Sequence, residues 1–460
     1  MVGASKAGDR GMRDALLLLT TLVVSLKSLA SPVFGILAYI CYGLLAPQGF
    51  TWYFARTFPH SFVIGLCTIF SYVTWQEKKK IPFLRETIML AALWVLFGIS
   101  TVFAIEPEWA QTKFIFLSKI FLMVFLSMLI LQTPERMQML ARVIALSLGF
   151  YAVKGAVFFI GTGGTGMVQA PEGSFLTANN SLGAALAMNA PLLFYLLRTE
   201  THVWLRRLVM AMLVCTYPAV IGTFSRGAWL ALGAATALMI MKSKHKVAIV
   251  ASAALLGVLV LIWFPQIVSD RVASRANTLQ NYEEDASAQS RFWNWEFCRR
   301  VGAAHPLLGA GFNYYSLKAY GIYYPEFLER WPGEQWSCHS TWLTIWGEHG
   351  IPAFLIWVGL IPSCWLSLMK IRAYGLANSE SLWMVHWVSA VRASMIAFFI
   401  AGTFVDFAYF DLYYELIGTV VILKVIVSNK QSESIKKTNL GEAEDTQQGL
   451  SSIPVSHTAT

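Results

Sequence analysis

The sequence predicts an all-α integral membrane protein with about twelve transmembrane helices and one large polar loop. Hydrophobic residues make up 56% of the 460 positions, whereas charged residues make up only 13%. Soluble domains carry about 25% charged residues, because their water-facing surface is built from them. Long apolar runs also follow one another along the chain, with basic residues after every second run. Most of the surface is therefore expected to face lipid.

The apolar runs give the positions of the spans, because a helix needs about 20 apolar residues to cross the hydrocarbon core. Such runs occupy 59–75, 84–104, 112–131, 137–160, 181–197, 205–222, 228–242, 247–264, 350–369, 385–405 and 411–427. The stretch 14–46 is too long for one simple span, and Lys27 and Pro32 interrupt it. We interpret it as one crossing made of a broken or partly re-entrant helix pair, because a cytoplasmic N-terminus requires an odd number of crossings here.

Basic residues fix the orientation, because short cytoplasmic loops collect Lys and Arg. Basic clusters lie at 78–85, 136–142, 198–207, 242–246, 370–372 and 430–437, so the connections between the other helix ends face outside. The chain then divides into a membrane domain of about nine spans (1–264), an outer loop (265–340), three further spans (341–428) and a disordered cytoplasmic tail (429–460). The net charge of +9 is explained by topology and by anionic lipid heads, and no nucleic-acid partner is expected.

The outer loop carries the candidate chemistry. Residues 290–300 (SRFWNWEFCRR) are typical of an amphipathic helix at the membrane interface, and HPLLGAG (305–311) ends it. His339 opens the next helix, where the helix dipole disfavours imidazolium and leaves a ring able to accept a proton. Cys298 and Cys338 are able to pair if the loop faces an oxidising compartment. The chain shows no metal-binding spacing such as CxxC or HExxH, so we expect no metal and no cofactor.

Two arginines lie at the predicted outer edge of the membrane. Arg226 follows the short connection 223–225, and Arg291 begins the amphipathic segment. Guanidinium groups bind phosphate oxygens in pairs, so the two side chains are expected to flank one anionic group. The alternatives are a snorkelling role for Arg226, a solvated position for Arg291 and a purely structural hydrogen bond for His339.

Three segments resemble the O-antigen ligase and polymerase superfamily of bacterial membrane glycosyltransferases. They are TFSRGAWLAL (223–232), SRFWNWEFCRRVGAAHPLLGAGFNYY (290–315) and CHSTWLTIWGEHGIPAFLIW (338–357). The segments GMRDALLLL (11–19) and GSFLTANNSLGAALAMNAPLL (173–193) further resemble the ligase-like branch that accompanies exosortase systems.

The resemblance implies a fold like that of type C membrane glycosyltransferases, in the bacterial inner membrane, with the active site and the loop 265–340 facing the periplasm. It implies transfer of a glycan from undecaprenyl diphosphate to the lipid A–core sugar of lipopolysaccharide, without metal. Arg226 and Arg291 would hold the diphosphate, and His339 would take the proton of the acceptor hydroxyl. Attack opposite the leaving group would invert the anomeric carbon.

Four further residues are candidates for the same site. Asn179 and Asn180 either bind sugar hydroxyls or cap the helix that follows them. Lys27 either lines a groove for the lipid phosphate or snorkels to the interface. Asp406 lies at an outer boundary, where it would orient a catalytic group.

Other functions remain open on the sequence. A polymerase that extends the repeat and a transferase acting on protein hydroxyls would share these motifs. A transporter of lipid-linked glycans would place paired charges or broken helices at the bilayer midplane, often within repeated halves. Here the charges gather at the outer edge and no repeat is found, which favours an enzyme.

Overall fold

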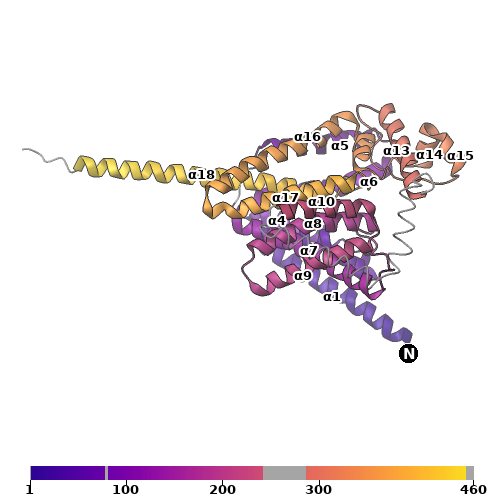
Figure 1. The fold of residues 1–460 in the computed structure, drawn as a ribbon, viewed down its shortest axis with the longest axis horizontal. Helices are drawn as coiled ribbons and strands as arrows, with labels where there is room; N and C mark the ends of the chain where they lie inside the picture. The colour runs from indigo at the N-terminus through magenta and orange to yellow at the C-terminus, as the bar shows by residue number, and fades with distance from the viewer. Residues whose placement is uncertain (1, 78–80, 242–285, 452–460) are drawn as a thin grey trace, which may run out of the picture.

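The computed structural model describes residues 2–77, 81–241 and 286–451 and shows a bundle of long helices (Figure 1). The helices of the bundle are α1 (Val2–Ala30), α2 (Pro32–Leu45), α4 (His60–Thr74), α5 (Arg85–Val102), α6 (Pro107–Ile130), α7 (Pro134–Gly161), α8 (Asn179–Thr199), α9 (Val203–Gly222), α10 (Arg226–Met241), α16 (Thr341–Ala377), α17 (Leu382–Gly402) and α18 (Asp411–Ser451). Three further helices, α13 (Ala286–Ala304), α14 (Leu317–Tyr323) and α15 (Pro325–Arg330), cover one end of it.

The two ends of the bundle differ. At the end covered by residues 286–340, here called the loop end, the Ile105 amide donates to the Ala310 carbonyl over 2.9 Å. At the opposite end, here called the tail end, Arg142 pairs with Glu200 over 2.8 Å. The helices alternate in direction between these two ends, as the sequence predicts. The predicted span 247–264 and residues 265–285 of the predicted loop lie outside the described residues.

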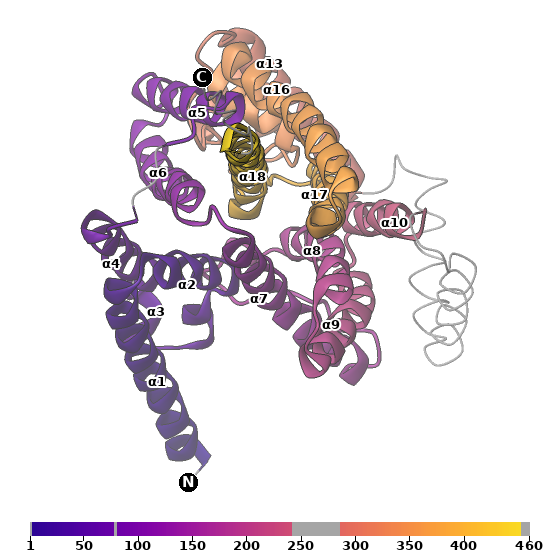
Figure 2. The same ribbon diagram turned by 90° about the vertical axis from the view of Figure 1, so that its left-hand side faces the viewer.

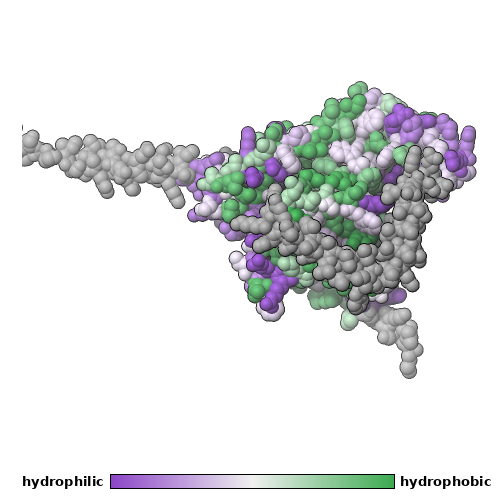
Figure 3. Space-filling model, in the orientation of Figure 1, coloured by the Kyte–Doolittle hydropathy of each residue, from purple (hydrophilic) through white to green (hydrophobic). Residues whose placement is uncertain are grey.

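The surface is that of a protein embedded in lipid. Within the described residues, seven helices are long and apolar enough to cross a membrane: α5, α6, α7, α8, α9, α16 and the helix Ser379–Gly402 that includes α17. Hydrophobic side chains gather between the two ends, and hydrophilic ones gather over α13–α15 and at the tail end (Figure 3). The all-helical membrane fold predicted from composition is therefore confirmed, whereas the count of twelve spans stays a prediction.

The predicted path of residues 14–46 is wrong. The Asp14 carboxylate accepts hydrogen bonds from the backbone amides of Trp52 and Tyr53 over 3.1 and 2.9 Å, so the middle of α1 lies beside the connection after α2. Deeper in the bundle, Gly35 of α2 lies close to both Ser28 of α1 and Thr68 of α4. Helices α1 and α2 therefore form an antiparallel hairpin that turns at Ser31 and begins and ends at the loop end. The prediction read the basic N-terminus as a cytoplasmic signal, whereas Arg10 and Arg13 lie over the Trp52 ring.

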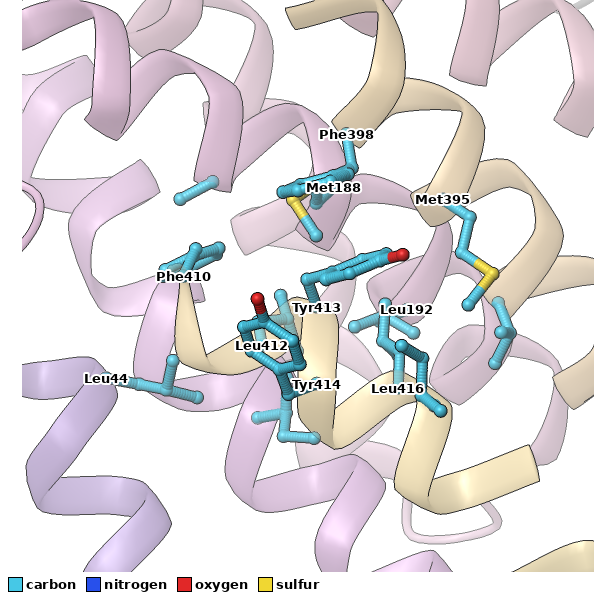
Figure 4. Packing of buried hydrophobic residues seen from close by; sticks show 14 of the residues in the cluster. Leu44, Met188, Leu192, Met395, Phe398, Phe410, Leu412, Tyr413, Tyr414 and Leu416 are labelled. Atoms are coloured by element: carbon cyan, nitrogen blue, oxygen red, sulfur yellow. The ribbon is translucent and has the colours of Figure 1, made fainter. Parts of the chain in front are cut away.

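The core of the bundle surrounds the first turns of α18, which lies between α5, α6, α16 and α17 in the end view (Figure 2). Tyr413 of α18 stacks on Phe398 of α17 with ring centroids 4.3 Å apart, and Tyr414 lies 4.8 Å from the ring of Phe121 of α6 (Figure 4). At the tail end, the fully buried Glu86 accepts hydrogen bonds from Ser363 and from Lys424. These contacts join α5, α16 and α18 from end to end.

The kink in α16 positions the turn 305–311 against the bundle. Gly350 has φ 75° and ψ −178°, which breaks the helix where the sequence predicts a new span to start. A Cβ at Gly350 would lie 2.5 Å from the Leu307 carbonyl oxygen, so only glycine fits. The Ile351 amide, left without a helical partner by the kink, donates to the Pro306 carbonyl over 2.7 Å.

Helix α18 continues to Ser451, although the sequence predicts disorder after residue 428. Residues 429–451 include several Lys, Glu and Gln residues, which are strong helix formers. A helix already nucleated inside the bundle extends through such residues at little cost.

Candidate functional site

Three connections meet at the loop end around the start of α16. The Thr341 hydroxyl donates to the Val405 carbonyl over 3.0 Å and accepts from the Phe407 amide over 3.1 Å. A Cβ added at Gly227 would lie 3.1 Å from Phe404, so the start of α10 packs on the same connection. The segments of Arg226, His339 and Asp406 are therefore neighbours, although they are far apart in the sequence.

A disulfide ties α13 to the segment that carries His339. Cys298 and Cys338 are bonded, with their Cα atoms 5.9 Å apart. The bond ends one residue before His339 and about two turns after Arg291 on α13. Pairing of these two cysteines, which the sequence left conditional, is thus present in the structure.

The disulfide is expected to stabilise the loop end. Replacing both Cys298 and Cys338 by serine should lower the free energy of unfolding by about 2–4 kcal/mol, because the reduced chain gains conformational freedom when unfolded. Thermal unfolding in detergent would measure this loss. Cys41→Ser is the matched control, since Cys41 is a free cysteine. Equal unfolding temperatures for wild type and double variant would contradict the prediction.

His339 and Arg291 interact. Burial lowers the pKa of His339 below its usual value, and the positive charge of Arg291 lowers it further. The imidazole is therefore neutral near pH 7 and able to accept a proton. His339 lies just outside the helix, because Ser340 is the N-cap of α16. Burial and Arg291 are the causes of its lowered pKa.

The backbone of His339 is held in an uncommon conformation. Its φ is 48°, in the left-handed region that few residues other than glycine adopt. Phe224, two residues before Arg226, has φ 54°. Such conformations persist only where the surroundings impose them, and they cluster at functional sites. The segment before Arg226 and the segment of His339 therefore each contain a residue with positive φ.

Arg226 is the first residue of α10, half-buried and held by a well-fixed turn. The Ser225 hydroxyl accepts from the Ala228 amide over 3.3 Å, which caps the helix. The Asn179 side chain donates to the Thr223 carbonyl over 2.7 Å. Asn179 therefore holds the turn before Arg226, which favours a structural role for it. Asn180 lies beside it, half-buried at the start of α8.

Asp406 belongs to a buried polar network rather than to the surface. Tyr315 donates to Glu348 over 3.2 Å and lies 3.5 Å from Asp406. Burial raises the pKa of Asp406, and the positive charge of Lys113 opposes that rise. The network lies within two turns of the start of α16, next to the His339 segment.

Glu348 is the centre of this network, and it is not among the site residues predicted from the sequence. Its carboxylate accepts from the Asn313 amide over 2.8 Å, from Tyr315 and from Tyr409, whose other neighbour is His349. Glu348 lies just before the predicted span 350–369, in a connection where a charged residue is ordinary, so the sequence did not indicate its burial.

Lys27 does not lie near the other candidate residues. It lies exposed in the last turn of α1, near the tip of the hairpin, with its ammonium 5.8 Å from the Phe34 ring centroid. Within the described residues no group of three or more His, Cys, Asp or Glu is arranged to hold a metal ion.

Comparison with protein families gives two matches. Residues 210–358 match a family described as O-antigen ligase. Residues 12–201 match a family of unknown function. No curated protein matches the chain. The first match covers α10, Arg226, Arg291 and His339, and ends after the kink in α16.

Proposed function

We propose, from the match of residues 210–358 to the O-antigen ligase family, that the protein transfers a glycan from undecaprenyl diphosphate to the lipid A–core sugar of lipopolysaccharide. The loop end would face the periplasm from the bacterial inner membrane. The observation that carries the proposal is a half-buried His339 within the electrostatic influence of Arg291 and beside a disulfide. A cation and a neutral imidazole are what displacement of a diphosphate by a hydroxyl requires.

The proposed reaction is a single displacement. The acceptor hydroxyl oxygen forms a bond to the anomeric carbon while the bond from that carbon to the diphosphate oxygen breaks. The electron pair leaves on the diphosphate, where Arg226 and Arg291 stabilise the growing negative charge. The hydroxyl proton goes to the His339 ring. Attack from the face opposite the leaving group inverts the anomeric configuration.

Reconstitution tests the proposal. The purified protein in liposomes would be given an undecaprenyl-diphosphate glycan together with one acceptor: lipid A–core, a second lipid-linked repeat, or a peptide rich in serine and threonine. We expect product on lipid A–core alone, measured by mass spectrometry. Product on the second repeat would identify a polymerase, and product on the peptide a protein transferase. Movement of the lipid-linked glycan across the bilayer without a new glycosidic bond would identify a transporter.

The effect of Arg291 on His339 gives a pH prediction. Transfer requires the neutral ring, so the rate should fall as the pH drops through the lowered pKa of His339. Arg291→Ala removes the nearby positive charge, which should raise that pKa and move the acidic limb of the kcat/KM profile to higher pH. Arg291→Lys keeps the charge and should keep the limb in place. If the acidic limb of the kcat/KM profile lies at the same pH in wild type and Arg291→Ala, Arg291 and His339 do not interact during turnover.

A further inference from the structure

Asn294 on α13 is buried without a hydrogen-bond partner. Its side chain is 1% exposed, and neither its amide nitrogen nor its amide oxygen has a partner in the structure. A buried polar atom without a partner costs about 1–3 kcal/mol, so nearly all such atoms in folded proteins are paired. Keeping both atoms of one amide unpaired needs a reason other than folding stability.

The neighbouring Trp295 repeats the feature. Its indole nitrogen is also buried and also lacks a partner. Within the described residues, consecutive residues with such atoms occur only here, and Asn294 alone has two of them. An amide offers a donor and an acceptor, and an indole offers a donor on a flat apolar ring. That combination fits a sugar, which presents hydroxyl groups around an apolar ring face.

The two residues lie next to the proposed reaction centre. At 100° per residue, Arg291, Asn294, Trp295 and Cys298 fall within one arc of about 100° on α13. Since Cys298 is bonded to Cys338, the side of α13 that carries Asn294 and Cys298 lies beside the segment of His339. Trp295 lies at the edge of this arc, where its ring is 5.7 Å from the ring of the exposed Phe292. Asn294 follows Arg291 by about 4.5 Å along the axis, which is close to the width of one sugar ring.

We propose that Asn294 and Trp295 form the subsite for the sugar attached to the diphosphate. This inference rests on the proposed function, because Arg291 would hold the diphosphate to which that sugar is linked. The Asn294 amide donates to one sugar oxygen and accepts from a neighbouring hydroxyl or acetamido group. The Trp295 indole donates to a further sugar oxygen. The side chains that cover both groups move aside when the sugar enters.

The test uses Asn294→Leu, which keeps the volume and removes both polar atoms. We expect its unfolding temperature to equal or exceed that of wild type, because no unpaired atoms remain buried. Its kcat/KM for the donor should nevertheless fall about 10–100-fold. Trp295→Phe, which keeps a ring and loses the N–H, should fall less. Arg299→Gln, on the exposed side of α13, is the control and should match wild type.

Binding separates this inference from the proposed function. A short-chain prenyl diphosphate carrying one N-acetylhexosamine should raise the unfolding temperature of wild type but not of Asn294→Leu. Delipidated core oligosaccharide should not distinguish the two proteins. If core oligosaccharide does so, the subsite belongs to the acceptor and the inference is wrong. It is equally wrong if Asn294→Leu binds and turns over the donor like wild type, or if it unfolds at a much lower temperature. Absence of transfer in wild type, with the donor shift intact, would count against the proposed function alone.

Discussion

Replacing His339 by alanine is expected to lower the rate of glycan transfer by about 10²–10⁴-fold while the protein remains folded. The imidazole is the group that takes the proton of the acceptor hydroxyl in the proposed reaction, and burial together with Arg291 keeps it neutral. The rate would be measured in liposomes with saturating donor and acceptor, and folding by thermal unfolding. His386→Ala is the control, because His386 lies at the tail-end half of α17.

A glutamine at position 339 distinguishes a base from a hydrogen-bonding residue. His339→Gln still donates and accepts hydrogen bonds but takes no proton, so its rate should stay close to that of the alanine variant. If the glutamine variant regains most of the wild-type rate, His339 acts by hydrogen bonding and the assignment as base fails. Partial rescue of His339→Ala by added imidazole would support it.

Glu348→Ala is expected to destabilise the protein by about 1–3 kcal/mol. The change leaves the Asn313 amide without its acceptor and takes the nearest acceptor from the Tyr315 hydroxyl, which keeps only the longer contact to Asp406. Glu348→Gln keeps one carbonyl oxygen in place and should lose less. Unfolding temperatures in detergent would measure both losses.

The exposed residue Glu329, in α15, provides the matched control for this network. Glu329→Ala removes a carboxylate from the same end of the molecule and should unfold within about 0.5 kcal/mol of wild type. If Glu348→Ala and Glu329→Ala were equally stable, the network around Glu348 would not hold the loop end together.

The sequence predicts those parts of the fold that follow from placing apolar helices in a lipid bilayer. Apolar length and the alternation of basic clusters locate the described helices from α4 to α18 and their directions, and Gly350 with Pro352 locates the kink. The hairpin of α1 and α2 is not predicted, because Asp14 meets its partners 38 residues or more along the chain. A rule based on charge counts has no access to such a contact.

The candidate site divides in the same way. Residue type and position give Arg226, Arg291 and His339, because their chemistry is expressed by single side chains. The network around Glu348 depends on packing of α16 against segments 33 and 61 residues away in sequence. The side-chain atoms of Asn294 and Trp295 are seen to lack hydrogen-bond partners only once the fold shows which groups surround them, and no sequence pattern contains that information.

The α1–α2 hairpin changes how fusion experiments on this protein are interpreted. Because Asp14 of α1 lies beside residues 52–55, a reporter joined ahead of α1 would occupy the same compartment as His339, and one joined after α18 would occupy the other (Figure 1). With the loop end in the periplasm, as proposed, alkaline phosphatase, which folds only after export, would be active at the amino end and silent at the carboxyl end. An affinity tag at the amino end would also lie on the face where substrates arrive, so purification handles belong at the carboxyl end.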